Sequence, residues 1–197
     1  MAKDSLRAFT GWMAWQGTIG YICKHHSPDA VLYLKATPFD DGSLMWSAGV
    51  EWGEVREYVE AASSLSLALM TLWKHVDERH RIFLSPEDFK RSPANYDEHD
   101  WLDLPTQDSL HRLIWTTRDV YQTGWKLVIM YQPIEEPQSR VEMVLSTPDD
   151  TPDLTVRGNT LLDACRRLFR DAAPHFVLYS QNLTTIALQD EDSHDSL

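Results

Sequence analysis

The chain has 197 residues, of which 43% are hydrophobic and 24% are charged. This is an ordinary globular composition, and the length suits one large domain or two small ones. The formal net charge is −12, from 30 acidic and 18 basic side chains. Repulsion from phosphates therefore disfavours binding to nucleic acid or to an anionic membrane over most of the surface.

Only two cysteines are present, Cys23 and Cys165, and they lack C-x-x-C spacing. This pattern predicts neither a disulfide framework nor a zinc-binding set, and favours two buried thiols. The longest apolar run, 65–73, is too short for the roughly 18 to 20 residues that cross a bilayer. We therefore expect a cytoplasmic protein with no membrane segment and no cofactor.

Apolar residues at helical spacing predict a short amphipathic helix over residues 6–13, and Gly17 and Gly20 weaken any continuation. A hairpin is predicted next, with strands at 31–36 and 44–52 joined by an acidic turn.

A third extended piece covers residues 57–60, after which Ser63 or Ser64 caps a helix that ends near His80. The buried stripe predicted for this helix is Leu65, Leu69, Leu72, Trp73 and Val76.

The middle of the chain, rich in proline and acidic residues, reads as a linker over 85–104. A helix follows, with apolar positions at Leu110, Leu113, Ile114, Val120 and Tyr121. Two further strands are predicted at 125–131 and 141–145.

The last predicted helix opens at Thr160 and stops at Pro174, because Thr160 and Asp163 match a capping box with Asp in place of Glu. We expect a final hairpin from 176–179 and 183–188, followed by a disordered acidic tail over 189–197.

The turn, second strand, cap and helix recur in the same order about 95 residues apart. Residues 39–42 align with 134–137, each combining an apolar residue, two acids and a turn residue. With the offset between the two copies increased by one residue, the helix that starts after Ser64 aligns with the helix that starts after Thr160. Coincidence is the alternative, since any two capped amphipathic helices share such spacing.

The predicted fold is thus α+β, made of two related strand-strand-helix units with antiparallel sheet packed on helices. The first unit spans 1–84 and the second spans 105–188. The pattern leaves open whether the units pack as a pseudo-dimer or share one sheet.

Residues 158–164, Gly-Asn-Thr-Leu-Leu-Asp-Ala, resemble the G-x-T-x-x-E-A segment that opens the helix in HicB-like antitoxin domains. The resemblance covers about fifty residues of the second unit. The first unit departs from it, with Ala62 at the glycine position and Leu67 at the acidic one. The resemblance implies a small sheet with helices on one face and a protein-binding regulator. The DNA-binding element that often follows this domain has no counterpart after Phe176.

Three residues in the middle of the chain, Asp97, His99 and Asp100, could hold a metal ion for a hydrolase. The segment lacks the ligand spacing and the glycine of a calcium loop, so a solvated acidic stretch is the preferred interpretation. His75 and His80 are five residues apart, on different sides of a helix, and a solvated helix end is preferred there. His25 and His26 are expected in an exposed turn between strands.

The acid pairs 40–41 and 135–136 are interpreted as turn residues, because adjacent side chains on a strand point to opposite faces. Cys165 falls on a predicted buried stripe, and no G-x-S-x-G or phosphate-binding glycine motif is present.

The chain contains eight tryptophans. Core filling is the preferred interpretation for any one of them, with at least one exposed member expected. As a group they could line a binding groove, because an indole combines large contact area with a polar handle. The candidates for this groove are Trp46, Trp52, Trp101 and Trp125, with Trp115 beside them.

The function expected from these patterns is a noncatalytic protein-binding or regulatory module, acting with a protein partner or as a homo-oligomer. Its interface would be a sheet edge or the tryptophans. Two alternatives remain: a metal-dependent hydrolase that uses Asp97, His99 and Asp100, and a purely structural protein.

Overall fold

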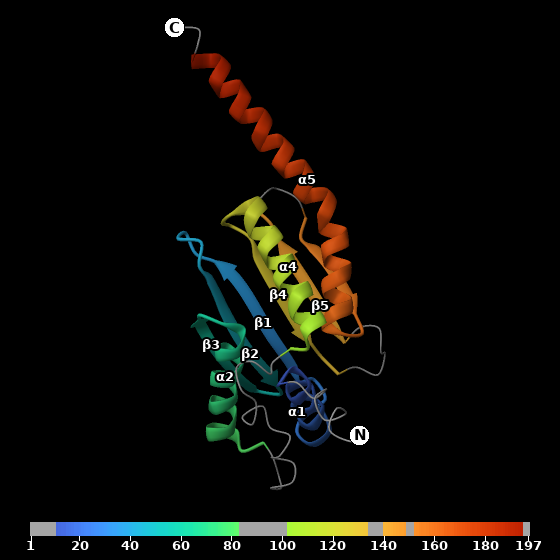
Figure 1. Ribbon diagram of the computed structural model, residues 1–197. Coiled ribbons are helices and arrows are strands. Elements are labelled where there is room, and N and C mark those ends of the chain that lie inside the picture. The colour runs from blue at the N-terminus through green and yellow to red at the C-terminus, as the bar shows by residue number, and fades with distance from the viewer. Residues whose placement is uncertain (1–10, 83–101, 134–139, 149–151, 195–197) are drawn as a thin grey trace, which may run out of the picture.

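The computed structural model describes residues 11–82, 102–133, 140–148 and 152–194, with side chains up to Ser180. These residues form helices and one six-stranded antiparallel sheet, so the α+β class is confirmed (Figure 1). In chain order the elements are α1 (Gly11–His25), β1 (Val31–Pro38), β2 (Leu44–Trp52), β3 (Val55–Ala62), α2 (Leu65–His80), α4 (Leu104–Tyr121), β4 (Lys126–Tyr131), β5 (Val141–Ser146), β6 (Leu154–Gly158) and α5 (Leu161–His194). The order helix, three strands, helix therefore occurs twice.

The two groups of strands form one continuous sheet. The strand order is β3-β2-β1-β4-β5-β6, with every neighbouring pair antiparallel. The central pair is β1 and β4, the first strand of each half, with Leu34 opposite Ile129. Of the two arrangements that the sequence left open, the joined sheet is the one observed.

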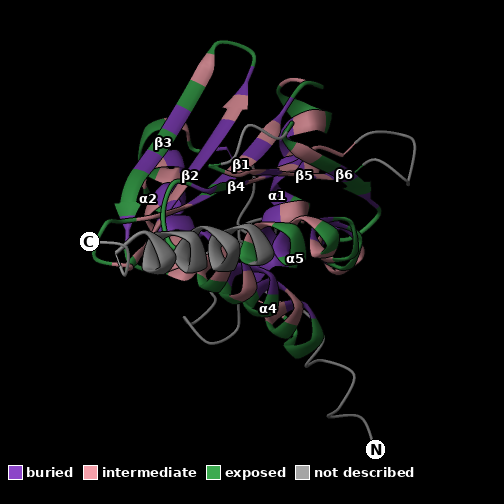
Figure 2. Cartoon of the chain, turned by 90° about the horizontal axis from the view of Figure 1, so that it is seen from above, coloured by how far each residue is buried: buried purple, intermediate pink, exposed green. Residues whose placement is uncertain are grey.

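One face of this sheet is buried and the other is open. Leu32, Leu34 and Ala36 alternate in β1 with half-buried or exposed residues, and Leu127 and Ile129 do the same in β4. The helices cover the buried face, since α2 packs on β2 and β3 and α5 packs on β5 and β6. Figure 2 shows α4 and α5 lying together on this side of the sheet. This arrangement is typical of antiparallel sheets with one solvated face.

Helix α2 agrees closely with its prediction. It runs from Leu65 to His80, and the Ser64 hydroxyl caps it by accepting a hydrogen bond from the Leu67 amide at 3.1 Å. Its buried residues are Ala68, Leu69, Leu72, Trp73 and Val76. The cap and the stripe are both local features, which is why the sequence was sufficient here.

Strand β3 contains an irregularity that the sequence did not predict. Trp46 pairs with Ala62 while Ala48 pairs with Val59, so β3 holds one extra residue between these pairs. Ala61, inside this bulge, has a φ of 60°. A bulge bends its strand and re-aims the chain, and this one lies immediately before the start of α2.

Two helices extend beyond their predicted bounds. The helix predicted over 6–13, of which residues 11–13 are described, continues through Gly17 and Gly20 to His25. His25 is therefore the last residue of a helix and His26 follows it, and neither lies in a turn between strands. Both histidines are exposed, as expected. Each glycine costs a helix about 1 kcal/mol. Burial of Trp15 and the other apolar residues of α1 offsets this cost.

Helix α5 continues through Pro174, so the predicted stop and the final hairpin are wrong. An interior proline costs about 3 kcal/mol or more. Contacts with α4 continue past this position, because Phe176 and Tyr179 pack against Tyr121 with ring centroids 6.0 and 4.6 Å apart. The helix changes direction part-way along (Figure 1), as proline-containing helices do.

Strand β6 was missed, since no strand was predicted between the one at 141–145 and the helix that opens at Thr160. Each unit is therefore strand-strand-strand-helix. Of the predicted linker 85–104, residues 85–101 lie outside the described residues. Helix α5 runs into the predicted disordered tail as far as His194. No helix in the described part of the chain is long and apolar enough to span a membrane.

Candidate functional site

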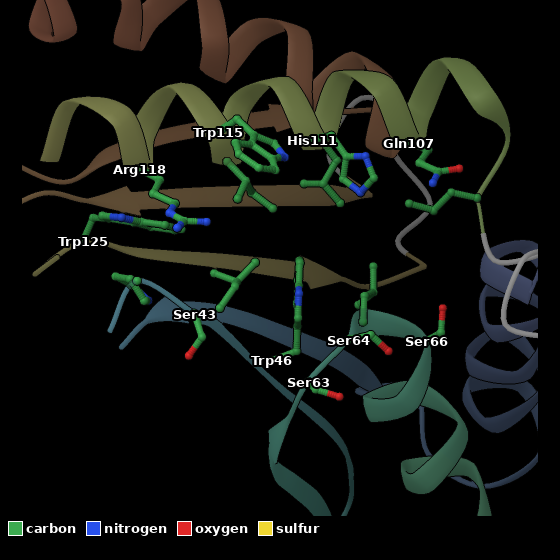
Figure 3. Close-up of a pocket in the computed structure, with 17 residues that line it drawn as sticks. Ser43, Trp46, Ser63, Ser64, Ser66, Gln107, His111, Trp115, Arg118 and Trp125 are labelled. Atoms are coloured by element: carbon green, nitrogen blue, oxygen red, sulfur yellow. The ribbon is translucent and has the colours of Figure 1, made fainter. Parts of the chain in front are cut away.

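A cavity of about 490 Å³ lies on the helix-covered side of the sheet, between α4 and the start of α2 (Figure 3). The first half of the chain contributes the β1–β2 turn, part of β2 and residues 63–66, and the second half contributes α4 and Trp125. Its lining is Pro38, Gly42, Ser43, Leu44, Trp46, Ser63, Ser64, Leu65, Ser66, Leu102, Gln107, Leu110, His111, Ile114, Trp115, Arg118 and Trp125. The volume falls within the roughly 300–1,000 Å³ typical of ligand sites.

Helix α4 presents two stripes to its surroundings. One is buried in the core and comprises Thr106, Leu110, Leu113, Ile114, Thr117 and Tyr121. The other is more polar and lines the cavity, with Gln107, His111, Trp115 and Arg118 spaced about one helical turn apart. In Figure 3, Arg118 and His111 extend from α4 toward the cavity, whereas the Trp115 ring lies across the helix.

Serine residues at the start of α2 form the opposite rim, with Ser63, Ser64 and Ser66 all lining the cavity. The β3 bulge brings the chain to this position. The first turn of α2 also lies at the positive end of the helix dipole, so this rim favours negatively charged groups.

Two of the four predicted tryptophans meet at the cavity. Trp46 and Trp125 both line it and are 6% and 1% exposed. The indole N–H of Trp125 is buried and has no acceptor among the described residues. Trp115 joins them from α4 and is 58% exposed at the rim. Buried tryptophans therefore form part of the cavity wall, and an exposed one lies at its rim.

The other two tryptophans are not part of this cavity as described. Trp52 lies at the far end of β2, where its ring meets His80 edge-on with centroids 5.2 Å apart. Trp101 lies outside the described residues, so its part in the groove stays a prediction.

Arg118 is the cationic group of the cavity. Its guanidinium lies 5.5 Å from the ring centre of Trp115, a cation–π distance. It also lies beside Gly42, where a Cβ atom would come within 3.1 Å of it. Within the part of the chain that the structure describes, Arg118 makes no hydrogen bond or ion pair.

Among the described residues that line the cavity there is no aspartate or glutamate. Asp41, in the adjacent turn, is exposed and accepts a hydrogen bond from the Ser43 amide at 2.8 Å. The pKa of Asp41 is lowered first by hydrogen bonds from Ser43, with Arg118 adding a smaller electrostatic contribution. In a protein of net charge −12, the described lining thus carries a positive charge at Arg118, with Asp41 beside it.

A buried carboxylate on β3 forms a second polar cluster, separate from the cavity. The Glu57 side chain is 8% exposed and accepts hydrogen bonds from Arg79 at 2.6 Å and His80 at 2.8 Å. Both partners lie in the last turn of α2, so the cluster fastens the end of this helix to the sheet edge. His80 therefore has a structural partner and is not simply solvated.

The predicted metal residues Asp97, His99 and Asp100 lie outside the described residues. Among the residues that are described, no group of three His, Cys, Asp or Glu side chains is placed to hold a metal ion. Cys23 and Cys165 are free thiols, and Cys165 is buried as predicted, whereas Cys23 is only half-buried. Burial raises the pKa of Cys165 to about 12, and that of Cys23 is also raised mainly by burial.

Comparison with known proteins does not add to this site. No protein-family profile matches the chain, and no curated protein matches its sequence. The fold defines the chain as an α+β protein with a six-stranded antiparallel sheet.

The position of Arg118 at the cavity was missed from the sequence, although a signal existed. Gln107, His111, Trp115 and Arg118 form a polar stripe beside the apolar stripe of the same predicted helix. Such a stripe is usually a solvated face. Only the position of the β1–β2 turn opposite α4 makes it a cavity wall.

Proposed function

We propose that this chain is a noncatalytic regulatory module that binds its target in the cavity between α4 and the start of α2. The observation that carries the proposal is the combination of a volume of about 490 Å³ with tryptophan walls and a polar rim. Few, well-placed polar groups around an apolar interior are typical of ligand sites.

The location of the cavity supports a regulatory role. Its walls come from both halves of the chain, which otherwise join through the β1–β4 pair. A target bound there contacts α4 of one half and α2 of the other, so it stabilises the arrangement in which the cavity is formed. Binding to the folded state raises stability by mass action, by about 2.7 kcal/mol at a hundred times the dissociation constant.

A protein target is consistent with the exposed edge of Trp115 at the rim, since tryptophan often dominates protein interfaces. The resemblance of residues 158–164 to HicB-like antitoxin domains also supports a regulatory module with a protein target. The hydrolase alternative depends on Asp97, His99 and Asp100, which the structure does not describe.

The proposal is tested by titration with 8-anilinonaphthalene-1-sulfonate, an aromatic anion that fluoresces in apolar sites. We expect saturable binding of one molecule per chain. His111→Trp should weaken this binding about tenfold or more by filling the middle of the cavity. Thr155→Trp, an exposed position of β6 outside the cavity lining, is the matched control and should bind as the wild type does.

Cooperative thermal unfolding of both variants verifies that the native fold is retained, because this dye also binds loosely packed states. Equal binding by the wild type and His111→Trp would contradict the proposal. A wild type that does not bind the dye would favour the purely structural alternative.

A further inference from the structure

We infer that the cavity takes a small amphipathic carboxylate, whose apolar body lies against the tryptophan walls and whose carboxylate pairs with Arg118. The inference rests on the proposed function and specifies the class of ligand. It is argued from the contacts of Arg118, the charges around the cavity and the shape of the cavity.

Arg118 is held in place without an ion pair to any described residue, and its anionic neighbour is the exposed Asp41, whose pKa it lowers slightly. Arg118 is half-buried, packs on the Trp115 ring at 5.5 Å and makes no hydrogen bond or ion pair with the described residues. A guanidinium offers several donors in a planar fork that matches the two oxygens of a carboxylate. Because Trp115 and the turn at Gly42 restrict the side chain, less conformational freedom is lost when a carboxylate binds.

The charge of the surroundings favours a small anion over an acidic protein. The lining residues that the structure describes include no acidic side chain. The nearby Asp41 carboxylate is exposed, accepts a hydrogen bond from the Ser43 amide and interacts weakly with Arg118. The chain as a whole carries a net charge of −12, which repels a large acidic partner over its full surface. A small molecule senses mainly the charges within a Debye length, about 8 Å at physiological salt.

The shape of the cavity suits a ligand with one charged end. Figure 3 shows Arg118 and Trp125 at one end, Ser64 and Ser66 at the other, and Trp46 between them. A carboxylate at Arg118 therefore leaves an apolar body along Trp46 and the α4 face.

Three probes with the same apolar body test the inference by titration calorimetry: 2-naphthylacetate, 2-(2-naphthyl)ethanol and 2-(2-naphthyl)ethylammonium. The wild type should bind the carboxylate about tenfold more tightly than the alcohol, and the ammonium compound most weakly. Arg118→Gln should reduce carboxylate affinity to that of the alcohol while leaving alcohol affinity unchanged. Arg118→Lys should retain part of the preference, because it keeps the charge and loses the fork.

Arg166→Gln is the control, since Arg166 is an exposed residue of α5 outside the cavity lining and the variant changes the net charge equally. Equal affinity of the wild type for carboxylate and alcohol would overturn the inference, as would equal effects of Arg118→Gln and Arg166→Gln. Failure of the carboxylate to bind also overturns it. If the dye still binds and His111→Trp blocks it, the cavity stands as a binding site for another class of ligand. If the dye fails as well, the proposed function is wrong.

Discussion

Replacing Gly158 by alanine tests how closely β6 and α5 are packed. Gly158 ends β6 just before the cap of α5. A Cβ atom placed on it would lie 2.8 Å from the amide nitrogen of Ala164 and 3.1 Å from the Cα of Ala164. Both are backbone atoms of α5, so no side-chain rotation can relieve the contact. The helix must move away from the strand.

The expected loss of stability has two opposing contributions. Overpacking of this kind costs about 1–3 kcal/mol. Gly158 does not have a positive φ, so alanine also gains about 0.4–1 kcal/mol by restricting the unfolded chain. The free energy of unfolding should therefore fall by about 1–2 kcal/mol.

Urea denaturation monitored by tryptophan fluorescence measures this change. Gly17→Ala is the matched control, because its Cβ atom would have nothing within 4 Å and the residue lies inside α1. This control should raise the free energy of unfolding by about 0.5–1 kcal/mol. If Gly158→Ala is neutral or stabilising, β6 and α5 are not packed as described and the reasoning is refuted.

Two further predictions concern buried groups. Glu57→Ala should lower the free energy of unfolding by about 1–3 kcal/mol. Arg79→Ala should lower it by less than about 1 kcal/mol, because the Arg79 side chain is 60% exposed. Equal losses of stability for the two variants in urea denaturation would contradict this prediction. In the folded protein Cys165 should resist a thiol reagent at about pH 8, and Cys23 should react first. The reactive form of cysteine is the thiolate, and burial raises the pKa of Cys165 from 9.0 to about 12. The folded state therefore holds the thiol proton of Cys165 more tightly than the unfolded state does. The stability that this protonated thiol contributes is lost as the pH rises from about 9 to about 12. Fast labelling of Cys165 without unfolding would show that it is not buried.

The helix caps could be predicted from short stretches of the sequence. Ser64 caps α2, as expected, and the Thr160 hydroxyl accepts from the Asp163 amide at 3.1 Å at the start of α5. Asp163 in turn accepts from the Asn159 amide at 3.3 Å, one residue before the cap. The pattern of a capping box was therefore sufficient to place the beginning of α5, although not its end.

The errors occur where a tertiary contact outweighs local preference. Pro174 predicts a stop, but contacts of Phe176 and Tyr179 with Tyr121 lie beyond it and keep the helix intact. Strand β6 has only five residues, with Thr155 and Arg157 exposed, so its alternation is too short to distinguish from a loop.

The α+β class, the core stripes of the helices and the recurring order of elements could be predicted from the sequence, because each depends on residues close together in the chain. The tertiary structure alone decided that the two halves share one sheet, since the pairing of β1 with β4 joins segments about 95 residues apart. It also decided that Trp46, Trp125 and Arg118 face one cavity. Periodicity shows which face of an element is apolar, whereas the neighbour of that face depends on how the whole chain packs.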